Sequence, residues 1–138
     1  MISNTELVKE AIEARKNSYA PYSHFKVGAA LLSKDGRIFR GCNIENSSYS
    51  PTNCAERTAF FKAVSEGVMQ FDAIAIVGGM EKETEAFSDF AFPCGVCRQV
   101  MREFCKSDFK IIVGKSATDF KVFTLNDLLP YGFGPENL

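Results

Sequence analysis

Two short segments stand out in this sequence, Thr52-Asn53-Cys54-Ala55-Glu56-Arg57-Thr58-Ala59 and Phe92-Pro93-Cys94-Gly95-Val96-Cys97-Arg98. The second segment holds two cysteines three residues apart, and the first holds a cysteine two residues before a glutamate. Three thiolates leave one position of a tetrahedral zinc ion open for water, and a nearby carboxylate can carry protons for that water. We therefore expect the rest of the chain to hold these two segments face to face.

The spacing of these residues suits the ends of helices. Cys94 and Cys97 share one face if they lie in the first turn of a helix, so both can bind one ion. Cys54 and Glu56 would diverge in the middle of a helix, but an ion beyond the helix tip can be reached from either side. Two helix starts would then point at one ion, and their positive ends favour thiolate over thiol.

Three thiolates carry enough negative charge to weaken the ability of a zinc ion to acidify water. An arginine that donates hydrogen bonds to the sulfurs would withdraw some of that charge. Arg57 is the first candidate because it follows the first segment's cysteine closely, and Arg98 is the second. The alternative for Arg57 is an ordinary surface charge.

Length and composition predict one globular domain, residues 1–138, with an ordinary hydrophobic fraction of 46%. The formal charge of -1 gives no electrostatic footprint for nucleic acid or an anionic membrane. No apolar run approaches the roughly 20 residues needed to span a bilayer, and the first residues lack the features of a secretory signal. The cytoplasm is the expected location.

Five cysteines are an odd number, and closely spaced cysteines in a reducing compartment more often indicate metal or redox chemistry than disulfides. Cys42 and Cys105 stand apart from the cluster and are expected to be small buried side chains. The single histidine, His24, is expected to be structural or exposed, so a histidine-rich metal site is excluded.

Hydrophobic periodicity and turn residues predict the order α-β-β-α-β-α-β-β-α, which implies one mixed sheet with helices packed over it. The first helix should begin at a capping box formed by Ser3 and Glu6, carry Tyr19 on its apolar stripe and end at Pro21. The acidic run 78–92 is expected to be solvated surface. The other predicted elements are strand 24–33, a strand through 37–40 that reaches 41–44, a helix over 53–66 capped by Thr52 or Asn53 and closed by Gly67, strand 71–77, a helix over 93–105, strands 109–113 and 120–123, and a helical turn over 124–130.

The sequence is similar to the small, homotetrameric, zinc-dependent cytidine deaminases of pyrimidine salvage. Five blocks in the same order carry the resemblance, namely residues 22–30, 41–46, 53–59, 93–99 and 128–135. Zinc deaminases combine a Cys or His ligand two residues before a non-ligand Glu with a Pro-Cys-x-x-Cys segment, as here. The resemblance implies a three-layer α/β/α fold with a central five-stranded mixed sheet and helices on both faces.

The resemblance also implies the chemistry. Cys54, Cys94 and Cys97 would hold one zinc ion per subunit, while Glu56 would carry a proton to the ring nitrogen next to C4. Hydroxide would add to C4 and ammonia would leave, converting cytidine or deoxycytidine to uridine or deoxyuridine.

Five further residues would bind the nucleoside according to the same resemblance. Asn43 and Glu45 would bind the ribose hydroxyls, and Phe25 would pack against the nucleoside, although a core position in a strand is the alternative for Phe25. Ala55 would donate its backbone N–H to the base carbonyl. Phe133 would reach the pocket of a neighbouring subunit in a homotetramer and stack on the base.

Two features depart from the family pattern, and several alternative functions remain compatible with the sequence. The stretch 79–92 is longer and more acidic than expected, and Phe92 stands where a small polar residue is common. A blasticidin S deaminase would share the mechanism. A dithiol redox protein would use Cys94 and Cys97 but leave Cys54 and Glu56 unexplained, and a noncatalytic zinc module would need no free glutamate. Editing of polynucleotides is disfavoured by the net charge of -1.

Overall fold

The computed structural model describes residues 2–138, which form one five-stranded mixed sheet with the strand order β2-β1-β3-β4-β5. β1 pairs antiparallel with both β2 and β3, β3 pairs parallel with β4, and β4 pairs antiparallel with β5. The strands are β1 Phe25–Ser33, β2 Ile38–Cys42, β3 Phe71–Met80, β4 Lys110–Gly114 and β5 Phe120–Thr124. The predicted mixed sheet of five strands is confirmed.

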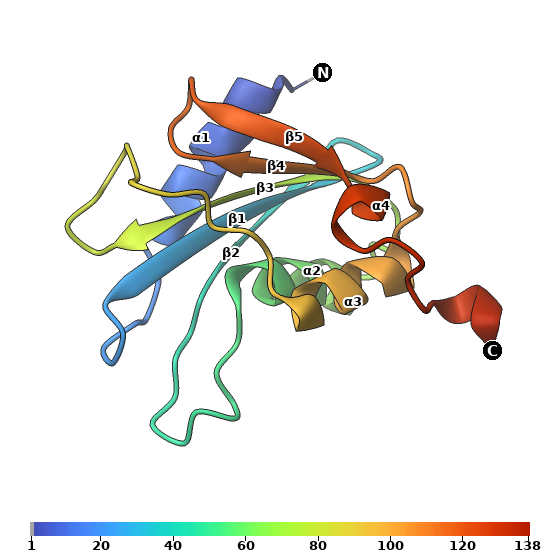
Figure 1. Cartoon of the computed structure of the whole chain (residues 1–138), viewed down its shortest axis with the longest axis horizontal. Helices are drawn as coiled ribbons and strands as arrows, with labels where there is room; N and C mark the ends of the chain where they lie inside the picture. Colours follow the sequence, from blue (N-terminus) through green and yellow to red (C-terminus); the bar gives the residue numbers. More distant parts are fainter. Residues whose placement is uncertain (1) are drawn as a thin grey trace.

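Helices cover both faces of this sheet, which makes a three-layer α/β/α fold (Figure 1). α1, Asn4–Arg15, lies on one face by itself. The opposite face carries α2, Ala55–Ser65, α3, Gly95–Phe104, and the short α4, Leu125–Leu128. A final 3-10 turn, Pro135–Asn137, lies beyond α3 at the C-terminal end of the chain (Figure 1).

Alternation of side chains along the strands supplies a separate core for each face. Ile74 and Ile76 pack toward α2 and α3, whereas Ala75 and Val77 pack toward α1. Phe60 of α2 is fully buried in the larger core. β3 is buried on both faces because helices cover it on both sides, which explains why its sequence is a continuous apolar run.

The first helix is shorter than predicted. The capping box of Ser3 and Glu6 is confirmed, but the helix ends at Arg15 and Tyr19 is 55% exposed. The chain leaves the helix because the backbone of Tyr19 pairs with the segment 43–45 instead, donating to the carbonyl of Asn43 and accepting from the N–H of Glu45.

The other element boundaries differ from the predicted ones by a few residues. α2 begins at Ala55 with Cys54 as its N-cap, so the expectation of Thr52 or Asn53 at that position was wrong. Gly67 has a φ of 85° and closes this helix as expected. β3 runs to Met80 because it stays paired with β1 up to Phe25.

The acidic segment 81–92 is anchored at two aromatic residues and is only partly the solvated surface that was predicted. Phe87 is buried, and the guanidinium of Arg15 lies 4.7 Å from the centre of its ring. Phe90 lies under two lysine ammonium groups, Lys115 at 4.7 Å and Lys121 at 4.9 Å from the ring centre. These contacts fix the course of the chain that leads into the second cysteine segment.

The cysteines outside the cluster are free thiols. Cys105 is buried as expected, and burial raises the pKa of its thiol to about 12. Cys42 is half-buried rather than buried. Within residues 2–138, no helix combines the length and apolarity needed to cross a membrane.

Gly28 of β1 should not tolerate a side chain. A Cβ on Gly28 would lie 2.6 Å from the backbone nitrogen of Arg15, because α1 crosses the strand closely there. We expect Gly28→Ala to lower the free energy of unfolding by about 1–3 kcal/mol, the usual cost of overpacking a core. Denaturant unfolding of Gly28→Ala beside Gly95→Ala tests this, since a Cβ on Gly95 meets no atom within 4 Å. Equal stability of the two variants would contradict the close approach.

Candidate metal centre

Three cysteine sulfurs meet where α2 and α3 begin. Cys54 is the N-cap of α2, Cys94 is the N-cap of α3, and Cys97 lies in the first turn of α3. The Sγ atom of Cys94 lies 3.9 Å from that of Cys54 and 3.5 Å from that of Cys97. All three sulfurs lie within 4.8 Å of one another. The two segments singled out in the sequence are therefore face to face.

The donor set fits a zinc ion. Neither Cys54 nor Cys94 uses its side chain to cap its own helix, although each occupies the N-cap position, so the sulfurs keep their electron pairs for another partner. Soft thiolate ligands in this number select zinc, and three of them leave a fourth position open. Among residues 2–138, these three cysteines form the cluster of side chains that could together hold a metal ion.

Hydrogen bonds within the cluster favour a thiolate at Cys54. A hydrogen bond from the Cys97 thiol, aided by the Arg57 guanidinium, lowers the pKa of Cys54 to about 5. The hydrogen bond to Cys54, together with burial, raises the pKa of Cys97.

Glu56 is a buried carboxylate beside the cluster. It is only 4% exposed and lies in the first turn of α2, two residues after Cys54. Burial raises the pKa of its carboxyl to about 7, and the negative Cys54 thiolate adds to this rise. A carboxyl with such a pKa can both accept and release a proton near neutral pH.

Arg57 lies against the sulfur cluster, as the sequence predicted. Its Nη2 atom donates a hydrogen bond of 3.2 Å to the Sγ atom of Cys54. Its Nε atom is buried and has no hydrogen-bond partner among the described residues. The guanidinium therefore binds a sulfur of the cluster and is not an ordinary surface charge.

Arg98 does not take the second position that the sequence suggested for it. Its Nε atom donates to the carbonyl of Pro93 at 2.7 Å, and its Nη1 atom donates to the carbonyl of Leu128 at 2.6 Å. These bonds use the guanidinium to brace the loop before α3 rather than to contact sulfur.

A small ladder brings residues 43–45 next to the start of α2. Ile44 pairs with Tyr19 on one side and with Asn53 on the other. Asn43 is held by β1, since its Oδ1 accepts from the N–H of Val27 at 2.9 Å and its Nδ2 donates to the carbonyl of Phe25 at 2.8 Å. The amide of Asn43 thereby links the β1 backbone to the loop that leads toward Cys54.

Glu45 is held in an ionised form. It accepts hydrogen bonds from the hydroxyl of Ser23 and from the backbone N–H groups of Tyr22 and Ser23. The Ser23 hydroxyl bond is the main reason that the pKa of Glu45 lies below its usual range. No sequence pattern pointed to Ser23 in this role, because its partner lies 22 residues away. A surface cavity of about 390 Å³ lies beside this carboxylate and is lined by Tyr22, Ser23, Glu45, Asn46, Tyr49 and Thr52.

The remaining predicted site residues occupy three different settings. Ala55 is fully buried as the first residue of α2, and Phe25 is 36% exposed at the start of β1. Phe133 is 58% exposed in the C-terminal tail that follows α4. The chain by itself thus brings the three candidate metal ligands, Glu56 and Arg57 together, whereas Phe133 is largely exposed.

Comparisons with known proteins agree with this geometry. Residues 1–114 match the family model described as cytidine and deoxycytidylate deaminase zinc-binding region. A cytidine deaminase of Halalkalibacterium halodurans is 51% identical over 96% of this chain and 95% of its own length. A cytidine deaminase of Sporosarcina psychrophila is 50% identical over 96% of this chain and 93% of its own length.

A solved structure agrees as well. The crystal structure of a cytidine deaminase from Burkholderia pseudomallei superposes with a TM-score of 0.86 at 44% sequence identity and covers 96% of this chain and 100% of that one. This chain therefore belongs to the cytidine and deoxycytidylate deaminase family and is an enzyme of the cytidine deaminase type.

Proposed function

We propose that this chain catalyses the zinc-dependent hydrolytic deamination of cytidine and deoxycytidine to uridine and deoxyuridine, with release of ammonia, in pyrimidine salvage. The observation that carries the proposal is the buried carboxyl of Glu56 beside three sulfurs at two helix starts. A purely structural zinc site has no need of such a buried acid, because its ligands alone hold the ion. We place the enzyme in the cytoplasm.

Cys54, Cys94 and Cys97 would hold the zinc ion. When bound, zinc would supply a Lewis acid that makes hydroxide available near neutral pH. Arg57, which donates to the sulfur of Cys54, would withdraw charge from the ligands and preserve that acidity.

Glu56 would carry the protons of the reaction. It would take one proton from the attacking water and deliver it to the ring nitrogen next to C4 of the base. Hydroxide would then add to C4, and Glu56 would relay the proton of the new C4 hydroxyl to the amino group, so that the C4–N bond breaks, ammonia leaves and the C4 carbonyl forms. A pKa near neutrality suits both transfers, since the carboxyl alternates between base and acid.

Residues of the neighbouring loop and strand would bind the nucleoside. Glu45, ionised and already oriented by Ser23, would accept from the ribose hydroxyls together with Asn43. Phe25 would pack against the nucleoside from the start of β1. Ala55 would donate its N–H to the base carbonyl, because amides of the first helical turn lack partners within the helix.

Phe133 would complete the pocket of a neighbouring subunit. Its side chain is 58% exposed in the tail that follows α4, which suits a ring that stacks on a base bound elsewhere. We accordingly propose a homotetramer in which the active sites are shared between subunits, with one zinc ion in each.

Replacing Arg57 by Gln should lower kcat about 10- to 100-fold, the usual effect of losing a residue that orients a metal ligand. The neutral amide cannot offset the charge of the thiolates, so the Lewis acidity of the ion falls. Steady-state kinetics with cytidine and zinc analysis of the same samples measure the two effects separately. Unchanged kcat in a zinc-loaded Arg57→Gln variant would show that this guanidinium does not tune the metal.

The proposed function is tested by adding the purified, zinc-loaded protein to cytidine and to deoxycytidine and following formation of the uracil nucleosides and ammonia. We expect turnover of both substrates. Failure of the zinc-loaded protein on both would overturn the proposal and direct the search to other aminopyrimidine nucleosides such as blasticidin S. Absence of zinc, combined with reversible oxidation of Cys94 and Cys97, would instead support the dithiol redox alternative.

A further inference from the structure

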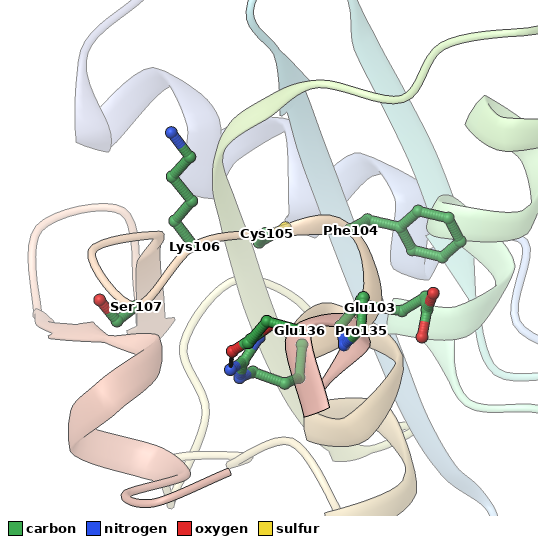
Figure 2. Close-up of a pocket in the computed structure, with 8 residues that line it drawn as sticks. Glu103, Phe104, Cys105, Lys106, Ser107, Pro135 and Glu136 are labelled. Carbon is green, nitrogen blue, oxygen red and sulfur yellow. Dashed lines mark hydrogen bonds and ion pairs between the residues drawn. The ribbon is translucent and has the colours of Figure 1, made fainter. Parts of the chain in front are cut away.

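The tail segment, residues 128–136, follows a defined course although little of it is buried. Tyr131 is fully exposed and has a φ of 56°, in the left-handed region that non-glycine residues rarely occupy. Phe133 is 58% exposed. A cavity of about 460 Å³ remains between the end of α3 and the tail, lined in part by Phe104, Lys106 and Pro135 (Figure 2). Apolar packing holds only the start of this segment, where Leu128 and Leu129 contact the larger core, and it does not account for the course of the chain beyond them.

Polar side chains of α3 hold the tail segment at three successive points. Arg98 donates to the carbonyl of Leu128 at 2.6 Å, and Gln99 donates its Nε2 to the carbonyl of Phe133 at 2.8 Å. Arg102 forms an ion pair with Glu136 near the end of the tail.

The three anchoring residues share one side of α3, because Arg102 follows Arg98 by four positions and Gln99 by three. They contact the tail in chain order, from its start to its end. This side of α3 is therefore a docking face for the tail segment.

The docking face begins one residue after the last cysteine of the cluster. Arg98 holds the carbonyl of Pro93 at 2.7 Å as well as that of Leu128, so one guanidinium joins the loop before Cys94 to the start of the tail. Gln99 then fixes the backbone of Phe133 itself. The helix that carries two sulfurs at its start thus also fixes the backbone at the residue that bears the exposed aromatic ring of the tail.

We propose that Gln99, supported by Arg98 and Arg102, is a positioning residue that fixes Phe133 for stacking on the nucleoside base, an inference that rests on the proposed function. An exposed segment that is free to move must lose conformational entropy each time a substrate binds. The hydrogen bond from Gln99 removes that cost in advance. Its loss therefore weakens nucleoside binding and leaves the chemical step intact.

The kinetic test compares Gln99→Ala with Asn126→Ala. Asn126 is an exposed residue of α4 whose side chain forms no hydrogen bond with the described residues of the tail. Gln99→Ala should raise KM for cytidine about 3- to 10-fold, the effect of one hydrogen bond, with kcat and zinc content within about 2-fold of the parent. Gln99→Glu, nearly isosteric but without the donor, should raise KM at least as much. Phe133→Ala removes the ring itself, so the rise in KM of this variant should be the largest that a Gln99 variant can cause.

A second readout follows the tail directly. The sequence contains no tryptophan, so Phe133→Trp introduces a single tryptophan, whose fluorescence reports on this position alone. We expect Gln99→Ala to lower the fluorescence anisotropy of Trp in that background, and Asn126→Ala to leave it unchanged.

The outcomes separate the inference from the proposed function. A parent protein without deaminase activity overturns both. If Phe133→Ala raises KM but Gln99→Ala changes neither KM nor anisotropy, the inference alone is overturned. A fall in kcat or zinc content of Gln99→Ala, with KM unchanged, overturns it too, because it would assign Gln99 to the metal loop.

Discussion

Replacing Glu56 by Gln should abolish deamination while the protein still folds and binds zinc. The substitution removes the proton carrier but keeps the size of the side chain, and loss of a positioned acid–base group costs about 10²–10⁴-fold in rate. We expect kcat for cytidine to fall by at least about 10³-fold, toward the upper part of that range, because in the proposed mechanism one carboxyl would serve two successive proton transfers. Zinc content should stay at the level of the parent, since Glu56 is not among the three sulfur ligands.

The thermal stability of Glu56→Gln should not fall. An ionised carboxylate that is 4% exposed carries a desolvation penalty, and the raised pKa of about 7 expresses that penalty. A neutral amide of the same shape avoids it. Retained stability with lost activity would separate a catalytic role of Glu56 from a structural one.

Glu66→Gln is the matched control, because Glu66 is an exposed glutamate at the opposite end of the same helix. The three proteins are compared by cytidine turnover, zinc analysis and thermal unfolding. Activity of Glu56→Gln within about 10-fold of the parent would be too high for loss of the general acid–base group and would refute that role. Loss of zinc would instead indicate that Glu56 supports the metal.

The metal centre could be predicted from sequence because its signals are local. The distance between Cys94 and Cys97 is fixed by the helix that they begin, and the same holds for Cys54 and Glu56. That the two helix starts meet depends on the sheet, but the predicted α-β-β-α-β-α order was enough to place both helices over one sheet. Arg57 was predictable for the same reason, since it lies three residues after Cys54.

The contacts that no pattern predicted join side chains to distant backbone carbonyls. Arg15 is 4% exposed and donates to the carbonyls of Lys26, Gly79 and Met80, which its place on a helix did not indicate. Arg98 was expected at the sulfurs but binds two carbonyls, one of them 30 residues away. A carbonyl acceptor exists at every residue, so the sequence carries no signal for which one a side chain will reach.

The first helix illustrates how tertiary pairing overrides a periodic pattern. Tyr19 falls on the apolar stripe of a longer helix, yet its backbone forms two hydrogen bonds with the segment 43–45. Ile44 of that segment pairs with Asn53 on its other side, which brings Asn43 and Glu45 beside the start of α2. A shorter helix is therefore part of what builds the predicted nucleoside site.

Replacing Cys94 by Ala should abolish both zinc binding and deamination without unfolding the chain. Two sulfurs remain, and an open site with two protein ligands cannot hold zinc as three do. Cys94 is exposed and lies outside both cores, so the fold keeps its apolar contacts. We expect zinc content to fall well below that of the parent and uridine formation to disappear with it.

Cys105→Ala is the matched control, since it removes a thiol from a buried position near the other end of the same helix. It should lose about 1 kcal/mol of unfolding free energy, in the range for removal of a small buried group, and keep its zinc and activity. The parent should also lose thermal stability when a chelator removes zinc, because a ligand that binds only the folded state stabilises it. Cys94→Ala should not respond to the chelator. Full zinc content in Cys94→Ala would mean that the ion is held by other groups, and a chelator-insensitive parent would mean that the three sulfurs hold no ion at all.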